Sequence, residues 1–302
     1  MAAENPFADG AAYVDGAYVP LAEARIPLID RGFTRSDATY DVFHVWEGRA
    51  FRLEDHLDRF ERNMAAMRFN PPLDRAAMRE TLIECVRLTG LRDAFVQMTL
   101  TRGLPVRGSR DPRLCQNRYY AFAMPFVWIA SEAQRAAGMH MHVSRVERIS
   151  PRAVDPRVKN FLWMDLTLGL LEAFDAGADI DILLDGAGNL TEGPGFNIFV
   201  VKDGRLATPA EGMFDGMTRR TVLELAHELG IPVEERLVPV EEARGADEVF
   251  ITSTAGGIMP ITLIDGVPVG GGQPGPMTRR VHDTYWSRKA EGWLGTPIDY
   301  RD

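Results

Sequence analysis

The chain has few cysteines, few lysines and no long apolar run. Its 302 residues include only two cysteines, Cys85 and Cys115, and neither belongs to a CxxC pair, so we expect a reducing, cytoplasmic environment rather than a disulfide framework. No apolar run reaches the roughly 18 residues of a membrane span, and the N-terminal MAAENPFADG lacks a signal-peptide pattern. The net charge of −9 argues against a surface for nucleic acid or anionic membrane.

Lysine is scarce where arginine is abundant. Of 34 basic residues only Lys159, Lys202 and Lys289 are lysines. A lysine in apolar surroundings can lose its proton near neutral pH, whereas an arginine cannot. Lys159 precedes the apolar stretch FLWM, while Lys202 lies in the turn VKDG and Lys289 in a charged C-terminal helix, neither with an apolar flank or a plausible set of partners. Lys159 is therefore the candidate for chemistry, although a helix-start lysine that extends to water would show the same pattern.

The composition and length predict a globular α+β chain in two parts. The chain is 45% hydrophobic and 25% charged, as in ordinary globular proteins, and its length suggests two domains. The strand pattern stops at WIASEAQRAAG, so we expect a smaller N-terminal domain at 1–126, a linker at 127–137 and a larger C-terminal domain at 138–302. No internal repeat or low-complexity tract is present.

Apolar periodicity predicts the main helices and strands. The N-terminal half has hairpin-like patterns over the first 50 residues, then helices over 53–69 and 74–90, and strands over 94–103 and 118–126 joined by RGLPVRGSRDP. The C-terminal half has a strand over 139–150, a helix over 164–176, and strands over 180–185 and 196–206. A helix over 217–230, a strand–loop–strand pattern over 247–266 and a helix over 275–292 follow.

Three further features of the sequence could bind the same ligand as Lys159. Glu192 in LTEGPGFNIF could hold a proton on a pyridine nitrogen. The glycine-preceded helix start GMTRRT at 216–221 offers main-chain N–H groups to a phosphate, and Arg59 could complete that anion site. Pyridoxal phosphate requires a covalent lysine, a carboxylate and an anion cup. Taken singly, each feature has a simpler explanation that is favoured over cofactor binding: Glu192 as a turn acid, GMT as an N-cap and Arg59 as a solvated helix residue.

Five motifs together resemble those of the class IV aminotransferases. HLDRF, VKN, LTEGPGFNIF, GMTRRTVLELA and TSTAGG occur in the order and at roughly the spacing of that family, from about residue 25 to 285. The resemblance implies a two-domain enzyme of fold type IV that binds pyridoxal 5′-phosphate and forms a homodimer in which a loop of the neighbour closes each site. Its expected ligands are a small-molecule amine and a keto acid, with no nucleic acid, membrane or metal.

The resemblance also implies the roles of individual residues. Lys159 is the expected Schiff-base lysine and general acid and base, and Glu192 the expected partner of the pyridine nitrogen. The expected phosphate-side contacts come from a helix, a helix start and the TSTAGG motif: Arg59, Met217, Thr218, Ser253 and Thr254.

Within the family, GFTRSDATYDVFHVWEGRAFRLEDHLDRF most resembles the (R)-selective amine transaminases. Those enzymes often have histidine where Arg35 stands and glutamate where Gln97 stands, so both departures affect the substrate pocket. Arg107 occupies the position of an arginine that binds a keto-acid carboxylate, and it is equally a solvated loop residue. The expected substrate contacts are Arg35, Tyr40, Val42, Phe95, Gln97, Arg107, Trp163, Thr254 and Ala255.

We therefore expect transfer of an amino group from an (R)-configured primary amine to a keto acid such as pyruvate. The alternatives on the same fold are a D-amino-acid or branched-chain aminotransferase, or a lyase of the aminodeoxychorismate type. Among unrelated functions, His140 and His142 could bind zinc from one strand face, but no third ligand stands nearby in sequence. A nucleotide-binding module around DGAGNLTEGPGF lacks the G-x-G-x-x-G spacing, and a non-catalytic ligand-binding protein is the remaining alternative.

Overall fold

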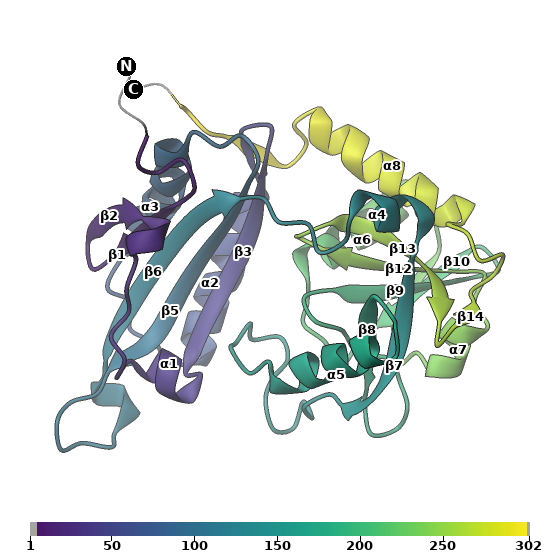
Figure 1. Ribbon diagram of the computed structural model, residues 1–302, viewed down its shortest axis with the longest axis horizontal. Helices are drawn as coiled ribbons and strands as arrows, with labels where there is room; N and C mark the ends of the chain where they lie inside the picture. The colour runs from purple at the N-terminus through teal and green to yellow at the C-terminus, as the bar shows by residue number, and fades with distance from the viewer. Residues whose placement is uncertain (1–4, 301–302) are drawn as a thin grey trace. The chain divides into compact units, whose positions relative to one another are not determined.

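The computed structural model describes residues 5–300 and divides into two compact units (Figure 1). The N-terminal unit takes the chain up to Val127, the segment Val158–Leu162 and the chain from Lys289 on. The C-terminal unit contains Trp128–Arg157 and Trp163–Arg288. Each unit combines a β-sheet with helices, which confirms the predicted α+β class in two parts.

The N-terminal unit contains a seven-stranded sheet in the order β15-β4-β3-β5-β6-β1-β2. Every neighbouring pair in it is antiparallel. Its strands are β1 (Ala11–Val14), β2 (Ala17–Pro20), β3 (Ala38–Trp46), β4 (Arg49–Phe51), β5 (Ala94–Leu104), β6 (Gln116–Pro125) and β15 (Gly295–Pro297). The two strands predicted over 94–103 and 118–126 are therefore confirmed as β5 and β6.

Two long helices cover one face of this sheet (Figure 1). The helix α2 (Leu53–Ala66) buries Leu57 and Phe60, as its apolar periodicity predicts. The helix α3 (Arg75–Thr89) begins where the Asp74 side chain accepts a hydrogen bond from Ala77 N at 2.8 Å, and ends at Gly90 in the left-handed conformation. The shorter helices of the unit are α1 (Arg31–Arg35), η1 (Leu21–Glu23) and η2 (Pro112–Leu114).

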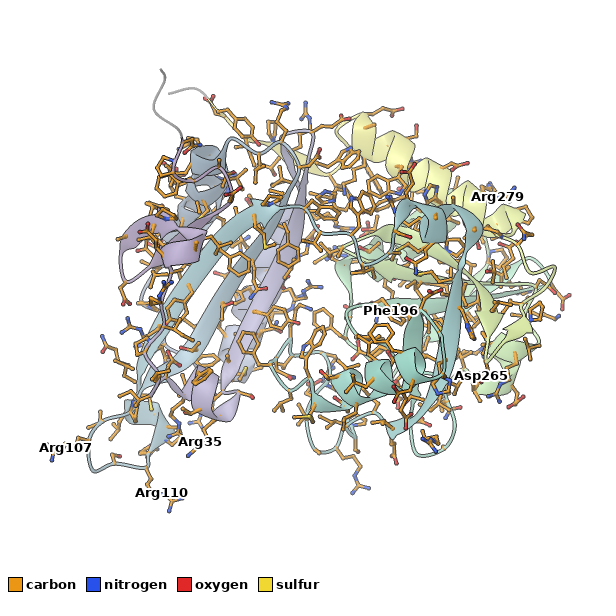
Figure 2. All side chains as sticks on the ribbon, viewed as in Figure 1. Arg35, Arg107, Arg110, Phe196, Asp265 and Arg279 are labelled. Atoms are coloured by element: carbon orange, nitrogen blue, oxygen red, sulfur yellow. The ribbon has the colours of Figure 1, made fainter. Side chains whose placement is uncertain are left out.

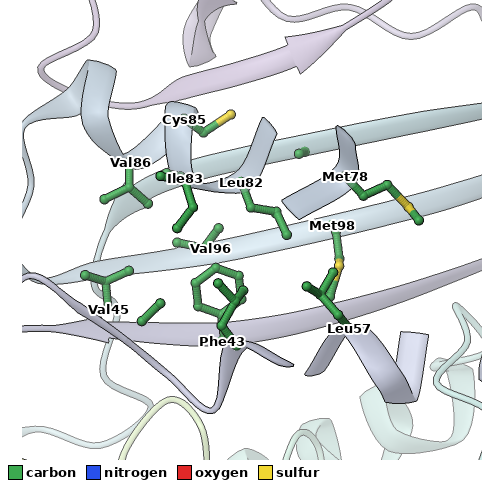
Figure 3. Packing of buried hydrophobic residues seen from close by; sticks show 14 of the residues in the cluster. Phe43, Val45, Leu57, Met78, Leu82, Ile83, Cys85, Val86, Val96 and Met98 are labelled. Atoms are coloured by element: carbon green, nitrogen blue, oxygen red, sulfur yellow. The ribbon is translucent and has the colours of Figure 1, made fainter. Parts of the chain in front are cut away.

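The alternation of side chains along β3 and β5 separates the core from the opposite face. Figure 3 shows Phe43 and Val45 of β3 with Val96 and Met98 of β5, packed against α2 and α3. Their neighbours along the strands point to the other face. Since Val42 pairs with Gln97 in the register, these two side chains share that face.

The C-terminal unit is built on a second, mixed sheet in the order β11-β10-β9-β12-β13-β7-β8, with β14 paired to β13. The pairs β10–β11, β13–β7 and β7–β8 are parallel, and the others are antiparallel. Its strands are β7 (Met139–Glu147), β8 (Ile180–Leu184), β9 (Asn197–Lys202), β10 (Arg205–Pro209), β11 (Val233–Arg236), β12 (Glu248–Ser253), β13 (Gly257–Ile264) and β14 (Val267–Pro268).

One strand prediction for this unit was wrong. The stretch 196–206 is two strands, β9 and β10, because the chain reverses at Asp203 and Gly204. Both residues have positive φ angles, 48° and 72°, as a tight hairpin turn requires. The turn predicted at VKDG is therefore confirmed, and only the single strand predicted over 196–206 is wrong.

The helices of the C-terminal unit are α4 (Glu132–Ala137), α5 (Met164–Asp175), α6 (Met217–Glu228), α7 (Val240–Arg244) and α8 (Pro276–Ala290), whose last two residues belong to the N-terminal unit. The predicted helices over 164–176, 217–230 and 275–292 are confirmed. The helix α4 lies within the stretch expected as a linker, and a capping box between Ser131 and Gln134 begins it. Within residues 5–300, no helix is long and apolar enough to cross a membrane.

The environment of Lys289 corrects a prediction made from the sequence. Lys289 was expected to lack apolar surroundings, but its exposed fraction is 4% and its Nζ lies 4.8 Å from the Phe51 ring centroid and 5.7 Å from that of Trp46. Its Nζ lies 2.8 Å from Nδ1 of the buried His44, which itself stacks on Phe126. Because β3 and β4 supply these neighbours from a distant part of the chain, the local sequence around Lys289 gave no sign of them.

This environment links Lys289 to the pH dependence of stability. Burial lowers the pKa of Lys289 from 10.5 to about 7, against a smaller opposing effect of Asp93. Burial, followed by the charge of Lys289, also lowers the pKa of His44 well below its usual value. Between pH 7 and 10.5 the unfolded chain therefore binds one proton more at Lys289 than the folded chain does, so this residue makes stability rise with pH across that window.

We predict that Lys289→Met removes this rise. The slope of the unfolding free energy between pH 7.5 and 9.5 should fall by up to ~1.4 kcal/mol per pH unit, the value for one proton. Urea unfolding at several pH values measures the slope. The control is Lys202→Met, because Lys202 is exposed and should leave the slope nearly unchanged. Equal slopes in wild type and Lys289→Met would show that Lys289 stays charged in the folded protein.

Candidate functional site

The segment that carries Lys159 lies along strand β3. The Lys159 carbonyl accepts hydrogen bonds from Thr39 Oγ1 at 2.7 Å and from Tyr40 N at 3.3 Å. The Lys159 Nζ lies 4.5 Å from the centroid of the Tyr40 ring, and that ring also packs against Phe161 at 5.1 Å. The structure thus brings together two predicted residues, Lys159 and Tyr40, and holds the lysine half-buried beside an aromatic face.

Four of the predicted substrate contacts share one face of the N-terminal sheet. Val42 lies opposite Gln97, and Tyr40 and Phe95 follow the same alternation on β3 and β5. Gln97 Nε2 donates to Thr99 Oγ1 at 3.0 Å, and the Phe95 ring stacks on Phe122 with centroids 6.1 Å apart. None of these four side chains is a carboxylate, an amine or a guanidinium, so they form an uncharged part of the face beside Lys159.

Two predicted arginines lie at the surface of the same unit. Arg35, at the end of α1, is exposed and donates to the Thr34 carbonyl at 2.6 Å. Arg107 is exposed on the loop between β5 and β6, and Figure 2 shows it and Arg110 pointing outward from that loop. Gly108 follows Arg107 with a φ of 81°, a conformation that favours glycine.

Arg59 is buried and held by a buried acid. Its Nε and one Nη nitrogen donate to the two oxygens of Asp41, both at 2.7 Å. His56 Nδ1 lies 2.8 Å from Asp41 Oδ1. Burial alone would raise the pKa of Asp41, but the Arg59 guanidinium and His56 hold it well below its usual range. A guanidinium has five N–H donors, so binding Asp41 does not exhaust its capacity for an anion.

Glu192 lies in a buried charged cluster of the C-terminal unit. Its Oε1 accepts from Arg148 Nη2 at 3.0 Å and from Nε at 3.2 Å, while its Oε2 accepts from Phe214 N at 3.0 Å. Arg148 also bonds Asp165. The following residue must be glycine, because a Cβ on Gly193 would lie 2.1 Å from a ring carbon of Phe196. Figure 2 labels Phe196 in this unit.

The start of helix α6 offers main-chain donors. Gly216 precedes the helix, and no side chain of the described residues caps it. A Cβ on Gly216 would lie 2.1 Å from Asn197 Oδ1, so only glycine fits there, and Asn197 Nδ2 donates to the Phe214 carbonyl at 2.7 Å. Met217 and Thr218, the first two helical residues, are buried with N–H groups that the helix itself leaves without partners.

The turn between β12 and β13 lies next to the loop that follows Glu192. Ser253 Oγ donates to the Gly195 carbonyl at 2.8 Å and accepts from Ala255 N at 3.1 Å. Thr254, between them, is partly exposed. Trp163 reaches within 3.7 Å of the position that a Cβ on Gly195 would take. The C-terminal unit therefore brings together predicted residues from four separate motifs.

The donor types at these positions fit the cofactor that the sequence implies. The C-terminal unit contains a buried carboxylate, a helix start with main-chain N–H groups, and hydroxyl groups, which are of the kinds that bind a ring nitrogen and a phosphate. The N-terminal unit contains the amine of Lys159 and the buried guanidinium of Arg59. The sequence did not single out the residues that hold these groups in place, namely Asp41, His56, Arg148, Asp165 and Asn197. Most of their contacts join residues far apart in the chain.

The two histidines of the zinc alternative are engaged elsewhere. His140 Nε2 accepts from Gly266 N at 2.8 Å, and His142 Nδ1 lies 3.0 Å from an Asp265 oxygen. Over residues 5–300, no three histidine, cysteine, aspartate or glutamate side chains are arranged to hold a metal ion. The geometry therefore gives no support to a zinc centre at these residues.

Comparisons with known proteins agree on one family. A family model described as amino-transferase class IV matches residues 38–264. A "Putative branched-chain-amino-acid aminotransferase" of Methanocaldococcus jannaschii is 32% identical over 276 residues, which cover 90% of this chain and 94% of that protein. The D-alanine aminotransferase of Bacillus licheniformis is 29% identical over 269 residues, covering 88% of this chain and 93% of that protein.

A solved structure agrees with the sequence comparisons. The branched-chain amino acid aminotransferase of Thermobaculum terrenum, crystallised in its PLP-form, superposes with a TM-score of 0.84 at 28% identity. The superposition covers 98% of this chain and 99% of that chain. Both units of the fold therefore have counterparts in that enzyme.

Proposed function

The chain belongs to the class IV aminotransferases, which use pyridoxal 5′-phosphate, and from this premise we propose its substrate class. We propose that it moves an amino group from an (R)-configured primary amine to a keto acid such as pyruvate. The observation that carries this proposal is the uncharged face of Tyr40, Val42, Phe95 and Gln97 beside Lys159. A fixed charge there would disfavour an aryl or alkyl group, because an unpaired charge against apolar surface costs several kcal/mol.

The proposed mechanism divides the work among the residues of the site. Bound pyridoxal phosphate supplies an aldehyde carbon for the amine and a pyridine ring that accepts electrons. Lys159 Nζ would hold that carbon and would act as general acid and base for the proton of the substrate carbon. Glu192 would keep the ring nitrogen protonated. The phosphate would be held by Arg59, Met217, Thr218, Ser253 and Thr254.

The keto acid requires a positive charge that the uncharged face lacks. Arg107 could supply it, since it sits beside Gly108 on an exposed loop between β5 and β6. We propose that Arg107 binds the carboxylate of pyruvate and withdraws when an uncharged amine is bound. Arg35, Trp163, Thr254 and Ala255 are the remaining proposed substrate contacts.

A second candidate function is an aminotransferase for branched-chain or D-amino acids. The names of the similar proteins favour it, since they describe enzymes for branched-chain amino acids and for D-alanine. In that case a positive side chain would bind the carboxylate of the donor as well as that of the acceptor.

The first prediction from the proposed function concerns Lys159. Lys159→Ala should abolish transamination and the visible Schiff-base absorbance, because no other described lysine lies beside the Tyr40 ring. Lys202→Ala is the matched control, since Lys202 is exposed and bonds Asp247. A Lys159→Ala protein with full activity would refute the assignment.

The second prediction concerns the phosphate. Arg59→Ala should weaken pyridoxal phosphate binding by ~1.5–3 kcal/mol, the usual range for a hydrogen bond to a charged group. Arg62→Ala, on the exposed side of the same helix, is the control. Repeating the titration with pyridoxal, which lacks the phosphate, should remove the difference between the variants. If the two variants bind pyridoxal phosphate equally well, Arg59 does not contact the phosphate.

The third prediction separates the two candidate substrates. With pyruvate as acceptor, (R)-1-arylethylamine should be a better donor than its S enantiomer, D-alanine analogues or L-branched-chain amino acids. Arg107→Ala should raise the KM for pyruvate and leave the amine half-reaction nearly unchanged, with Arg110→Ala as the control on the same loop. Activity confined to amino acids would establish the second candidate, and equal loss of both half-reactions would make Arg107 structural.

We also propose that the enzyme is a homodimer in a reducing, cytoplasmic environment. The free thiols of Cys85 and Cys115 support the environment. The exposed apolar side chains of α5 support the dimer: Met164, Leu168, Leu171 and Phe174.

The fourth prediction tests the dimer. Light scattering should give the mass of a dimer, whose interface should bury more than ~2,000 Å² for an obligate pair. Leu171→Glu should weaken it, whereas Val267→Glu, a similarly exposed apolar position on β14, should not. An active monomer would contradict the proposal.

A further inference from the structure

Arg148 lies between two buried carboxylates in the C-terminal unit. Its Nη2 and Nε bind Glu192 Oε1 at 3.0 and 3.2 Å, and its Nη1 binds Asp165 Oδ2. All three side chains are at most one-tenth exposed. A fork of this kind fixes the guanidinium and both carboxylates in one geometry, because the N–H donors of arginine are rigidly spaced.

One guanidinium pairs with two carboxylates in this cluster, those of Asp165 and Glu192. Burial lowers the pKa of Arg148, but the Glu192 and Asp165 carboxylates outweigh it and raise that pKa above its usual value, so Arg148 stays charged.

Both carboxylates that bind Arg148, those of Asp165 and Glu192, also accept hydrogen bonds from the main chain. Asp165 accepts from Ile149 N at 2.9 Å and lies in the first turn of α5, where the helix dipole favours an acid. Glu192 Oε2 accepts from Phe214 N at 3.0 Å. The carboxylate of Glu192 is thus held at both oxygens, with Arg148 on one of them, and its orientation depends on Arg148.

The position of Arg148 also decides which of two bases would hold a shared proton. A positive charge lowers the proton affinity of nearby bases, and the effect falls with distance. Arg148 bonds Glu192 directly, whereas a ring nitrogen bound by Glu192 would interact with Arg148 only through that carboxylate. Arg148 therefore lowers the proton affinity of Glu192 more than that of the ring, and the proton is favoured on the ring.

We propose that Arg148 is a positioning residue that keeps Glu192 ionised and oriented, so that the proton remains on the cofactor's ring nitrogen. The inference rests on the proposed role of Glu192. It adds a residue, Arg148, and through it Asp165, to those on which electron withdrawal by the ring depends.

The test compares the affinities of each apoenzyme for pyridoxal 5′-phosphate and for the analogue in which carbon replaces the ring nitrogen. Their ratio reports the interaction at the ring nitrogen and does not depend on activity. Arg148→Met should lower the ratio by about tenfold, on the order of one charged hydrogen bond. Arg148→Lys, which retains the charge, should recover most of it. Arg152→Met, on an exposed residue of the same loop, should leave it unchanged.

Two further variants separate the inference from the function on which it rests. If Glu192→Gln has the wild-type ratio, then Glu192 does not contact the ring and the proposed function fails. If the affinity ratio falls in Glu192→Gln but stays at the wild-type value in Arg148→Met, the proposed function stands and the inference about Arg148 is overturned.

The double variant Arg148→Met/Glu192→Gln should match Glu192→Gln alone, because Arg148 acts through Glu192. Additive losses would show that Arg148 acts elsewhere. Should Arg148→Met fail to fold, Arg148→Gln removes the charge while keeping a donor to Glu192, and the same ratio decides the question.

Discussion

The hydrogen bonds that the Lys159 carbonyl accepts from Thr39 and Tyr40 determine where the candidate catalytic amine lies. They attach a five-residue segment of a distant part of the chain to strand β3. One face of β3 is buried in the core against α2 and α3, and Tyr40 and Val42 lie on its other face. Core packing, the position of the amine and the uncharged substrate face therefore depend on a single strand.

The C-terminal unit relies on a different constraint, the close approach of main chain at glycines. Gly193 and Gly216 each occupy positions where a Cβ would lie 2.1 Å from a neighbouring side chain. These contacts let the Glu192 loop, the Phe214 main chain and the start of α6 lie next to one another. Asn197 Nδ2 donates to the Phe214 carbonyl, and Phe214 N donates to Glu192 Oε2. Buried polar groups need such partners, because leaving one unpaired costs ~1–3 kcal/mol. The site of this unit is consequently a polar network with little freedom to shift.

The sequence predicted what depends on local pattern. The apolar face of α2, the helix start at Gly216 and the strand pair around Ser253–Ala255 follow from residue spacing, and the motifs in their order indicated the family. The sequence did not predict features that depend on contacts between residues far apart in the chain. Without the fold, Asp41 could not be recognised as the partner of Arg59, nor Arg148 as that of Glu192. Lys289 was expected to lack apolar surroundings because β3 and β4, which provide them, are distant in the chain. The hairpin at Asp203-Gly204 is different, since its turn signal was present in the sequence.

The central claim is that Lys159, and no other lysine, binds the cofactor covalently. Borohydride reduction of the holoenzyme fixes the cofactor to its lysine, and peptide mass spectrometry then identifies the modified residue. We expect a pyridoxyl phosphate group on the peptide that contains Lys159, at about one per chain. Modification of Lys289, whose pKa is lowered to about 7 by burial, or of Lys202, with Lys159 unmodified, would contradict it.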